Sequence, residues 1–176
     1  VANLVPVKGI EILLDAFIRL SKYDNFLKLF IVGAKDNNYG KRLELIAKNS
    51  KISEKIHFTG KVENVIDYYS ISDIFVLPTL DEGRKEGCPV SLLEALSANI
   101  KVIASDVSGI RDILYDYPEN MFEAGNTSEL IQKIKNQLQN NNNSHNEFIK
   151  LVKNNYRIDL EVSQHEKIYN KVCHQQ

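Results

Sequence analysis

The amino-acid sequence predicts an α/β fold built on a parallel β-sheet with helices on both faces. Short apolar runs of strand length alternate with longer segments whose apolar residues recur at helical spacing. Glycine or proline follows several of these runs, as at Gly33, Gly60, Pro78 and Gly109. Such alternation is typical of β-α-β units, which bind ligands outside the carboxyl ends of the strands. The expected architecture is Rossmann-like, and these four residues would ring its ligand edge.

The first half of the chain predicts three strands after an initial extended segment. Residues 1–5 have the composition of a strand. Residues 10–20 place isoleucine, leucine and phenylalanine on one stripe, which predicts a helix. The other elements expected here are strands at 27–33, 55–60 and 73–77 and helices at 39–49 and 62–70.

The second half continues the alternation and then becomes helical. A dense apolar stretch beginning at Pro89 predicts a buried helix, and Thr127 or Asn126 would cap a later one. The expected elements are strands at 101–105 and about 120–123 and helices at 89–98, 109–115, 127–138, 147–154 and 160–172. The last two helices are amphipathic, so their apolar residues need a partner in this domain or in another.

A run of four asparagines at 140–143 marks a polar linker. The sequence therefore predicts a Rossmann-like domain at 1–139, a linker at 140–144 and C-terminal helices at 145–176. Val1 opens a strand-like run without an initiator methionine. We expect the chain to be a fragment of a longer protein.

Composition excludes several classes of protein. The chain has 176 residues and a formal net charge of −1, which gives no broad attraction to nucleic acid or anionic lipid. Two cysteines, Cys88 and Cys173, are too few and too far apart for a disulfide framework, so a reducing cytoplasm fits best. No apolar run is long enough to cross a membrane.

Two glutamates flank the start of the helix predicted at Pro89. Glu86 stands on the preceding loop, and Glu94, eight positions later, lies about one turn inside the helix. First-turn amides have no partner within a helix and attract phosphate oxygens, while a carboxylate can accept hydrogen bonds from a ribose diol. The pattern predicts a nucleotide-sugar site. Taken alone it is weak evidence, because glutamates also favour helix starts and solvated loops.

Lysine and arginine residues near the same edge could bind a diphosphate. Lys8 directly precedes the first helix, and Arg84 and Lys85 flank Glu86. Each of them is also explained as a solvated loop residue.

The sequence predicts no metal site. The four histidines show no ligand spacing, no Asp-x-Asp triplet occurs, and His57 is expected to be structural. Dinucleotide-binding, P-loop and serine-hydrolase motifs are also absent from the sequence.

Several ordered motifs together resemble the C-terminal half of retaining glycosyltransferases of the GT-B fold, group 1 (family 4). They are the segments 1–9, 29–33, 56–60, 72–78, 86–96 and 102–109. The resemblance spans nearly the whole chain and is far more specific than the pair of glutamates.

The resemblance implies roles for residues of the predicted site. Glu86 would contact hydroxyls of the transferred sugar, and Lys8 would contact the diphosphate. The backbone at Gly87 and Cys88 would contact the sugar or the diphosphate, and Glu94 would bind the ribose. Positive groups would stabilise the departing diphosphate, because the family transfers sugar with retention and usually without metal.

Three further residues would lie beside the base: Gly60, Lys61 and Val62. The chain departs from the family at two points. Asn3 stands where most relatives carry an arginine that acts with Lys8 on the diphosphate. Either another cation substitutes, with Arg84 as the candidate, or phosphate binding is weaker in this chain. The motif Gly-Cys-Pro at 87–89 replaces the commoner Gly-Phe-Gly and removes an N–H at Pro89.

We therefore expect a donor-binding lobe that takes a sugar from a UDP- or GDP-type donor, needs no cofactor and does not bind nucleic acid. An N-terminal lobe outside this chain would bind a polysaccharide, glycolipid or related acceptor, and the last helix would resemble the family's crossover segment. The expected location is the cytoplasm, with peripheral association at the inner face of the membrane left open. Two alternatives stay open, a sugar-nucleotide epimerase of GT-B fold and a non-catalytic flavodoxin-like binding module.

Overall fold

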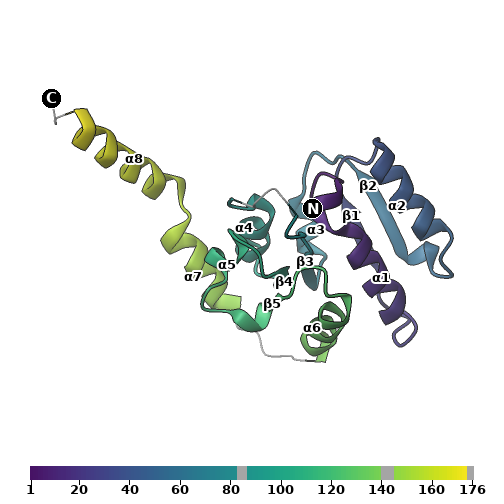
Figure 1. Ribbon diagram of the computed structural model, residues 1–176. Helices are drawn as coiled ribbons and strands as arrows, with labels where there is room; N and C mark the ends of the chain where they lie inside the picture. Colours follow the sequence, from purple (N-terminus) through teal and green to yellow (C-terminus); the bar gives the residue numbers. More distant parts are fainter. Residues whose placement is uncertain (83–86, 140–144, 174–176) are drawn as a thin grey trace.

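The computed structural model describes residues 1–82, 87–139 and 145–173 (Figure 1). Its α-helices are α1 (Ile10–Leu20), α2 (Asn38–Lys48), α3 (Ile66–Ser70), α4 (Val90–Ser97), α5 (Ile110–Ile113), α6 (Thr127–Gln139), α7 (His145–Asn155) and α8 (Ile158–Cys173). Its strands are β1 (Leu29–Val32), β2 (Ile56–Gly60), β3 (Ile74–Leu77), β4 (Lys101–Ser105) and β5 (Met121–Phe122). Short 3-10 helices lie at η1 (Pro6–Lys8), η2 (Ser53–Lys55) and η3 (Pro118–Asn120).

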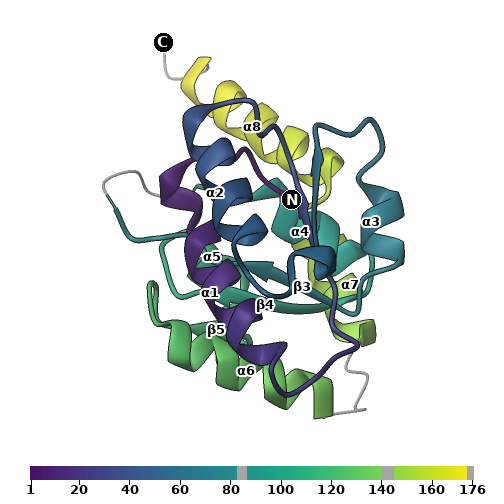
Figure 2. The same cartoon turned by 90° about the vertical axis from the view of Figure 1, so that its right-hand side faces the viewer.

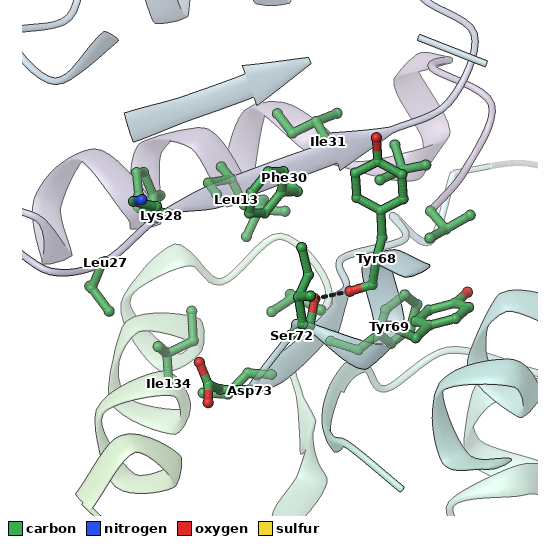
Figure 3. A pocket seen from close by; sticks show the side chains of 18 of the residues that line it. Leu13, Leu27, Lys28, Phe30, Ile31, Tyr68, Tyr69, Ser72, Asp73 and Ile134 are labelled. Atoms are coloured by element: carbon green, nitrogen blue, oxygen red, sulfur yellow. Dashed lines mark hydrogen bonds between the residues drawn. The ribbon is translucent and has the colours of Figure 1, made fainter. Parts of the chain in front are cut away.

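All the strand pairs are parallel, as the sequence predicted, but they form two sheets. β1 pairs with β2, and a second sheet has the order β3-β4-β5. A cavity of about 340 Å³ lies between the sheets (Figure 3). Its walls are mainly apolar and include Phe30 and Ile31 of β1 and Ile74 and Phe75 of β3.

The strand predicted at 1–5 is wrong. The Ala2 amide donates to the Val32 carbonyl at 2.9 Å, so the chain touches the carboxyl end of β1. It then bends, because the Val5 amide donates to the Asn3 carbonyl two residues back at 3.0 Å, and Pro6 begins η1. Residues 1–5 therefore form no strand between β1 and β3.

Helices cover both faces of the β3-β4-β5 sheet, which confirms the predicted layers. Successive strand residues face opposite sides, so Ile103 of β4 packs in a cluster with α1 and α6 while Val102 and Ala104 pack in a cluster with α4. Figure 2 shows α6 below the strands, and one end of α1 packs beside it. A further cluster joins α1 and α2 to the β1-β2 sheet.

Side-chain caps explain several helix boundaries. The predicted helix 62–70 begins only at Ile66, because the Asn64 carboxamide accepts the Ile66 amide at 3.2 Å and favours a turn there. Asn126 and not Thr127 caps α6, accepting the Glu129 amide at 3.0 Å. The helix predicted at 109–115 is α5 alone, since the chain leaves helical geometry at Leu114.

The two C-terminal helices differ in their contacts. Phe148 of α7 is 3% exposed and packs against the α4 side of the sheet, where its ring meets Tyr117 edge-on. No described residue of α8 is buried, and Ile158, Val162 and Ile168 are all exposed. The helix projects away from the two sheets (Figure 1). Thus α7 finds its apolar partner in this domain, and α8 finds none within the described ranges. No helix in the part of the chain that the structure describes is long and apolar enough to span a membrane.

Candidate nucleotide-sugar site

Lys8 is held at the carboxyl end of β3 by the segment around it. Lys8 closes η1, and Gly9 follows with φ +62, a conformation in which L side chains are strained. A Cβ on Gly9 would stand 1.9 Å from the Pro78 carbonyl oxygen, so only glycine allows this approach. The Leu80 amide also donates to the Val7 carbonyl at 2.8 Å. The fold thus brings half-buried Lys8 beside the loop that leads toward 83–86, and its contact with a diphosphate stays a prediction.

Asn3 lies on the same edge, near the end of β1. Gly33, directly after β1, packs so closely on this segment that a Cβ there would stand 1.7 Å from the Ala2 carbonyl oxygen. The Asn37 carboxamide donates to the Leu4 carbonyl at 2.8 Å and fixes the segment from the other side. Asn3 itself is exposed at this edge.

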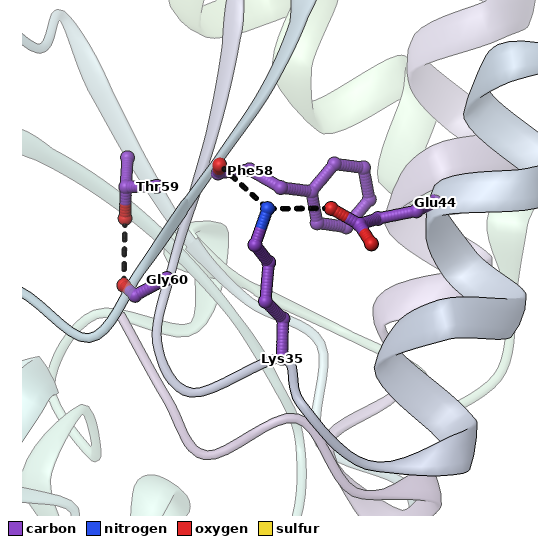
Figure 4. Close-up of polar contacts among 5 residues, drawn as sticks. All are labelled: Lys35, Glu44, Phe58, Thr59 and Gly60. Carbon is purple, nitrogen blue, oxygen red and sulfur yellow. Dashed lines mark hydrogen bonds and ion pairs between the residues drawn. The ribbon is translucent and has the colours of Figure 1, made fainter.

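Gly60 ends β2 at the same edge, and Lys61 after it is exposed. The Gly60 carbonyl accepts a hydrogen bond from the Gly33 amide at 3.0 Å, which joins the ends of β1 and β2. Lys35, which the sequence reasoning missed, reaches this corner, but its ammonium pairs with Glu44 at 2.6 Å and with the Phe58 carbonyl at 3.5 Å (Figure 4). Lys35 therefore holds the loop after β1 to α2 and the side of β2.

At the start of α4, at the edge of the second sheet, the backbone amides of Val90 and Ser91 have no hydrogen-bond partner among the described residues, whereas the Leu92 amide donates to the Pro89 carbonyl at 2.9 Å. Pro89 is the N-cap, with an extended ψ of 104°, so the helix begins one residue later than predicted. No side chain of the described residues caps it. Within the described part of the chain, Gly87 has no atom within 4 Å of where a Cβ would stand, which leaves space over its backbone.

Cys88 is an exposed thiol beside this opening. Partial burial and the charge of Glu161, on α8, raise the pKa of the Cys88 thiol. It stays protonated near neutral pH and is therefore not suited to be a nucleophile. A contact through its backbone, as predicted, needs no thiolate.

Glu94 lies one turn into α4, as predicted, and is half-buried. The Tyr69 hydroxyl, from α3, donates to Glu94 Oε2 at 2.9 Å. Tyr69 is 2% exposed, and burial together with the Glu94 hydrogen bond raises the pKa of its hydroxyl. The carboxylate predicted to bind ribose is therefore held by a buried donor that the sequence reasoning did not identify.

Glu86 and Arg84 lie outside the described residues. Their predicted roles, and the relative placement of the Glu86 and Glu94 carboxylates, stay predictions. The structure does bring Lys8, Asn3, Gly60, Gly87 and Glu94 to the carboxyl ends of the parallel strands, where such folds bind ligands.

The described residues contain no group of three or more His, Cys, Asp or Glu side chains that could hold a metal ion. His57 stacks on Phe30 with ring centroids 5.1 Å apart, as expected of a structural residue. The cavity between the sheets lies next to this edge, because Ala2, Val32 and Tyr69 are among the residues that line it.

A parallel α/β lobe with helices on both faces of its larger sheet has the architecture of one lobe of a GT-B fold. The chain belongs to the family described as glycosyl transferases group 1, which matches residues 1–155. It is 29% identical over 134 residues to the capsular polysaccharide biosynthesis glycosyltransferase CapH of Staphylococcus aureus, covering 76% of this chain and 36% of that protein.

Solved structures show the same fold. A glycosyltransferase from Rickettsia africae ESF-5 superposes with a TM-score of 0.86 at 23% identity, covering 98% of this chain and 46% of that one. Anabaena HepE in complex with UDP superposes with a TM-score of 0.85 at 16% identity, covering 97% of this chain and 47% of that one. The chain thus spans less than half the length of these relatives.

Proposed function

We propose that this chain is the donor-binding lobe of a retaining glycosyltransferase that transfers a hexose-type sugar from a UDP- or GDP-sugar to a polysaccharide, glycolipid or related acceptor. The observation that carries the proposal is the Glu94 carboxylate, held by Tyr69 one turn into α4 at the carboxyl edge. Membership of the family supports it. UDP in the HepE structure and the capsular polysaccharide role in the name of CapH support the donor and acceptor classes.

The bound donor would lie across the carboxyl ends of both sheets. Glu94 accepts hydrogen bonds from the ribose hydroxyls, and Gly60, Lys61 and Val62 flank the base. Lys8 faces the diphosphate, with Asn3 as an uncharged donor nearby. The open backbone at Gly87 and Cys88 allows the sugar or diphosphate to approach closely.

Chemistry at this site requires stabilisation of the departing diphosphate. Its negative charge grows as the bond to the sugar breaks, so fixed cations and amides near it lower the barrier. Lys8 and the first-turn amides of α4 supply this charge without a metal, Arg84 adds to it, and Glu86 orients the sugar hydroxyls.

The acceptor would bind to a second lobe outside this chain. The exposed apolar residues of α8 suit a crossover helix that packs on such a lobe. Because half of the cleft is then absent, we expect the 176-residue chain to bind donor nucleotide and transfer no sugar. The whole protein would act in the cytoplasm, at or near the inner face of the membrane.

Calorimetric titration of the chain with UDP and GDP tests the proposal. Glu94→Ala should weaken binding of the preferred nucleotide about tenfold or more, because hydrogen bonds to a charged group contribute roughly 1.5 to 3 kcal/mol. Glu54→Ala is the matched control, since Glu54 is an exposed residue of η2 just before the amino end of β2. Absence of binding to both nucleotides, or unchanged affinity in Glu94→Ala, would contradict the assignment.

A further inference from the structure

Two adjacent tyrosines of α3 point in different directions. Tyr68 extends toward β1, where its ring meets Phe30 at 5.9 Å, whereas Tyr69 points toward α4 (Figure 3). The Tyr69 ring packs edge-on against Phe75 at a centroid distance of 5.9 Å and is 2% exposed. Its position is therefore fixed by the core on the α4 side of the sheet.

The Tyr69 hydroxyl meets two acceptors on α4. Glu94 Oε2 lies at 2.9 Å and the Ser91 carbonyl at 3.2 Å. A hydroxyl has one proton to donate, and the bond to an ionised carboxylate is the shorter and stronger of the two. The hydroxyl therefore anchors one oxygen of Glu94.

An anchored carboxylate retains acceptor capacity for a ligand. A carboxylate has about four lone-pair sites on its two oxygens, so Oε1 is left for further donors. Without an anchor, a glutamate side chain loses rotamer freedom when it binds a ligand, and that loss weakens binding. Tyr69 removes this cost in advance, because its own ring is already immobile.

We propose that Tyr69 is a positioning residue that orients the Glu94 carboxylate toward the two hydroxyls of a nucleotide ribose. The inference rests on the proposed function, since it concerns the same site. Tyr69 itself lies beneath Glu94 and does not touch the ligand. The raised pKa of its hydroxyl keeps the proton in place across the physiological range.

The test compares two ligands and two matched variants. The dissociation constants of UDP and 2′,3′-dideoxy-UDP are measured for the wild-type chain, Tyr69→Phe and Tyr68→Phe. Tyr69→Phe retains the ring and should weaken binding of UDP roughly three- to tenfold, while the affinity for 2′,3′-dideoxy-UDP stays unchanged. Tyr68→Phe removes a hydroxyl from the neighbouring position and should change neither constant. If the wild type prefers GDP, the guanosine pair of ligands replaces the uridine pair.

The pattern across ligands separates positioning from a general structural effect. Equal losses for UDP and dideoxy-UDP, or no loss for either, would overturn the role of Tyr69 while leaving the nucleotide site in place. Failure of the wild type to bind any nucleotide would instead overturn the proposed function. Glu94→Ala offers a second route: combined with Tyr69→Phe it should lose no more UDP affinity than Glu94→Ala alone, because Tyr69 acts through Glu94.

Discussion

Two segments supply the candidate site from the same edge of the fold, and they differ in how tightly they are packed. The segment at 6–9 is pressed against the end of β3, with Gly9 against the Pro78 carbonyl. The segment from Gly87 to Glu94 is open at its beginning, where none of the described residues comes within 4 Å of a Cβ added at Gly87, and is held at its end by Tyr69.

The difference shows that glycines near one site can serve different purposes. Gly9 is required by the fold, because its φ and its contact exclude a side chain. Gly87 is not required by the described fold, so a role for it must come from a ligand. Substitutions that separate stability from binding can therefore test each segment independently.

The largest effect is expected at Gly9. Gly9→Ala combines a strained φ with an overlap against a backbone oxygen, so the free energy of unfolding should fall by about 3 kcal/mol or more. Urea denaturation monitored by circular dichroism measures it. A loss below about 1 kcal/mol would show that the segment can shift and is less rigid than described.

Lys8, in the same segment, should matter for binding and little for stability. If Lys8 faces the diphosphate as we propose, Lys8→Ala should weaken binding of UDP about tenfold, or roughly 1.4 kcal/mol, and binding of UMP clearly less. Calorimetry with both nucleotides measures the difference. Equal losses of affinity for UDP and UMP would show that Lys8 does not contact the β-phosphate.

The hydrogen bond from Tyr69 to Glu94, in the segment from Gly87 to Glu94, predicts that the folded chain loses stability at alkaline pH. The raised pKa of Tyr69 means that the unfolded chain releases this proton near pH 10 while the folded chain retains it. Stability from this group is thus present below pH 10 and declines as pH rises above it. Tyr69→Phe should reduce that decline by about 1 kcal/mol at pH 11, measured by urea denaturation against Tyr68→Phe. An identical pH profile in Tyr69→Phe and wild type would refute the anchored hydroxyl.

The smallest effect on stability is expected at Gly87. Gly87→Ala should change the free energy of unfolding by no more than about 0.5 kcal/mol, because an added Cβ meets no atom of the residues that the structure describes. If the sugar or diphosphate approaches this backbone, the same variant should weaken binding of the nucleotide sugar. Unchanged binding would remove Gly87 from the site.

Local patterns predicted much of the fold. The helix at 10–20 and the strand at 101–105 occur as predicted, because their apolar residues follow the helical and strand periods without interruption. Glu94 also falls in its predicted place, since the start of α4 follows from composition and Pro89. These features depend on neighbours in sequence.

The sequence-based predictions were wrong where a distant contact or a single side chain determines the local structure. The start of α3 depends on one hydrogen bond of Asn64, and residues 1–5 bend although they read as a strand. Lys35 pairs with Glu44 across a loop, which no motif signals.

The alternation of strands and helices, the family and most of the candidate residues could be predicted from the sequence, because periodicity and motifs depend on residues that are close together along the chain. Which side chains hold the candidate residues in place depends on tertiary packing and could not be predicted. Tyr69 meets Glu94 across 25 positions only because α3 and α4 pack on the same face of one sheet, and Gly9 is indispensable only because Pro78 lies against it.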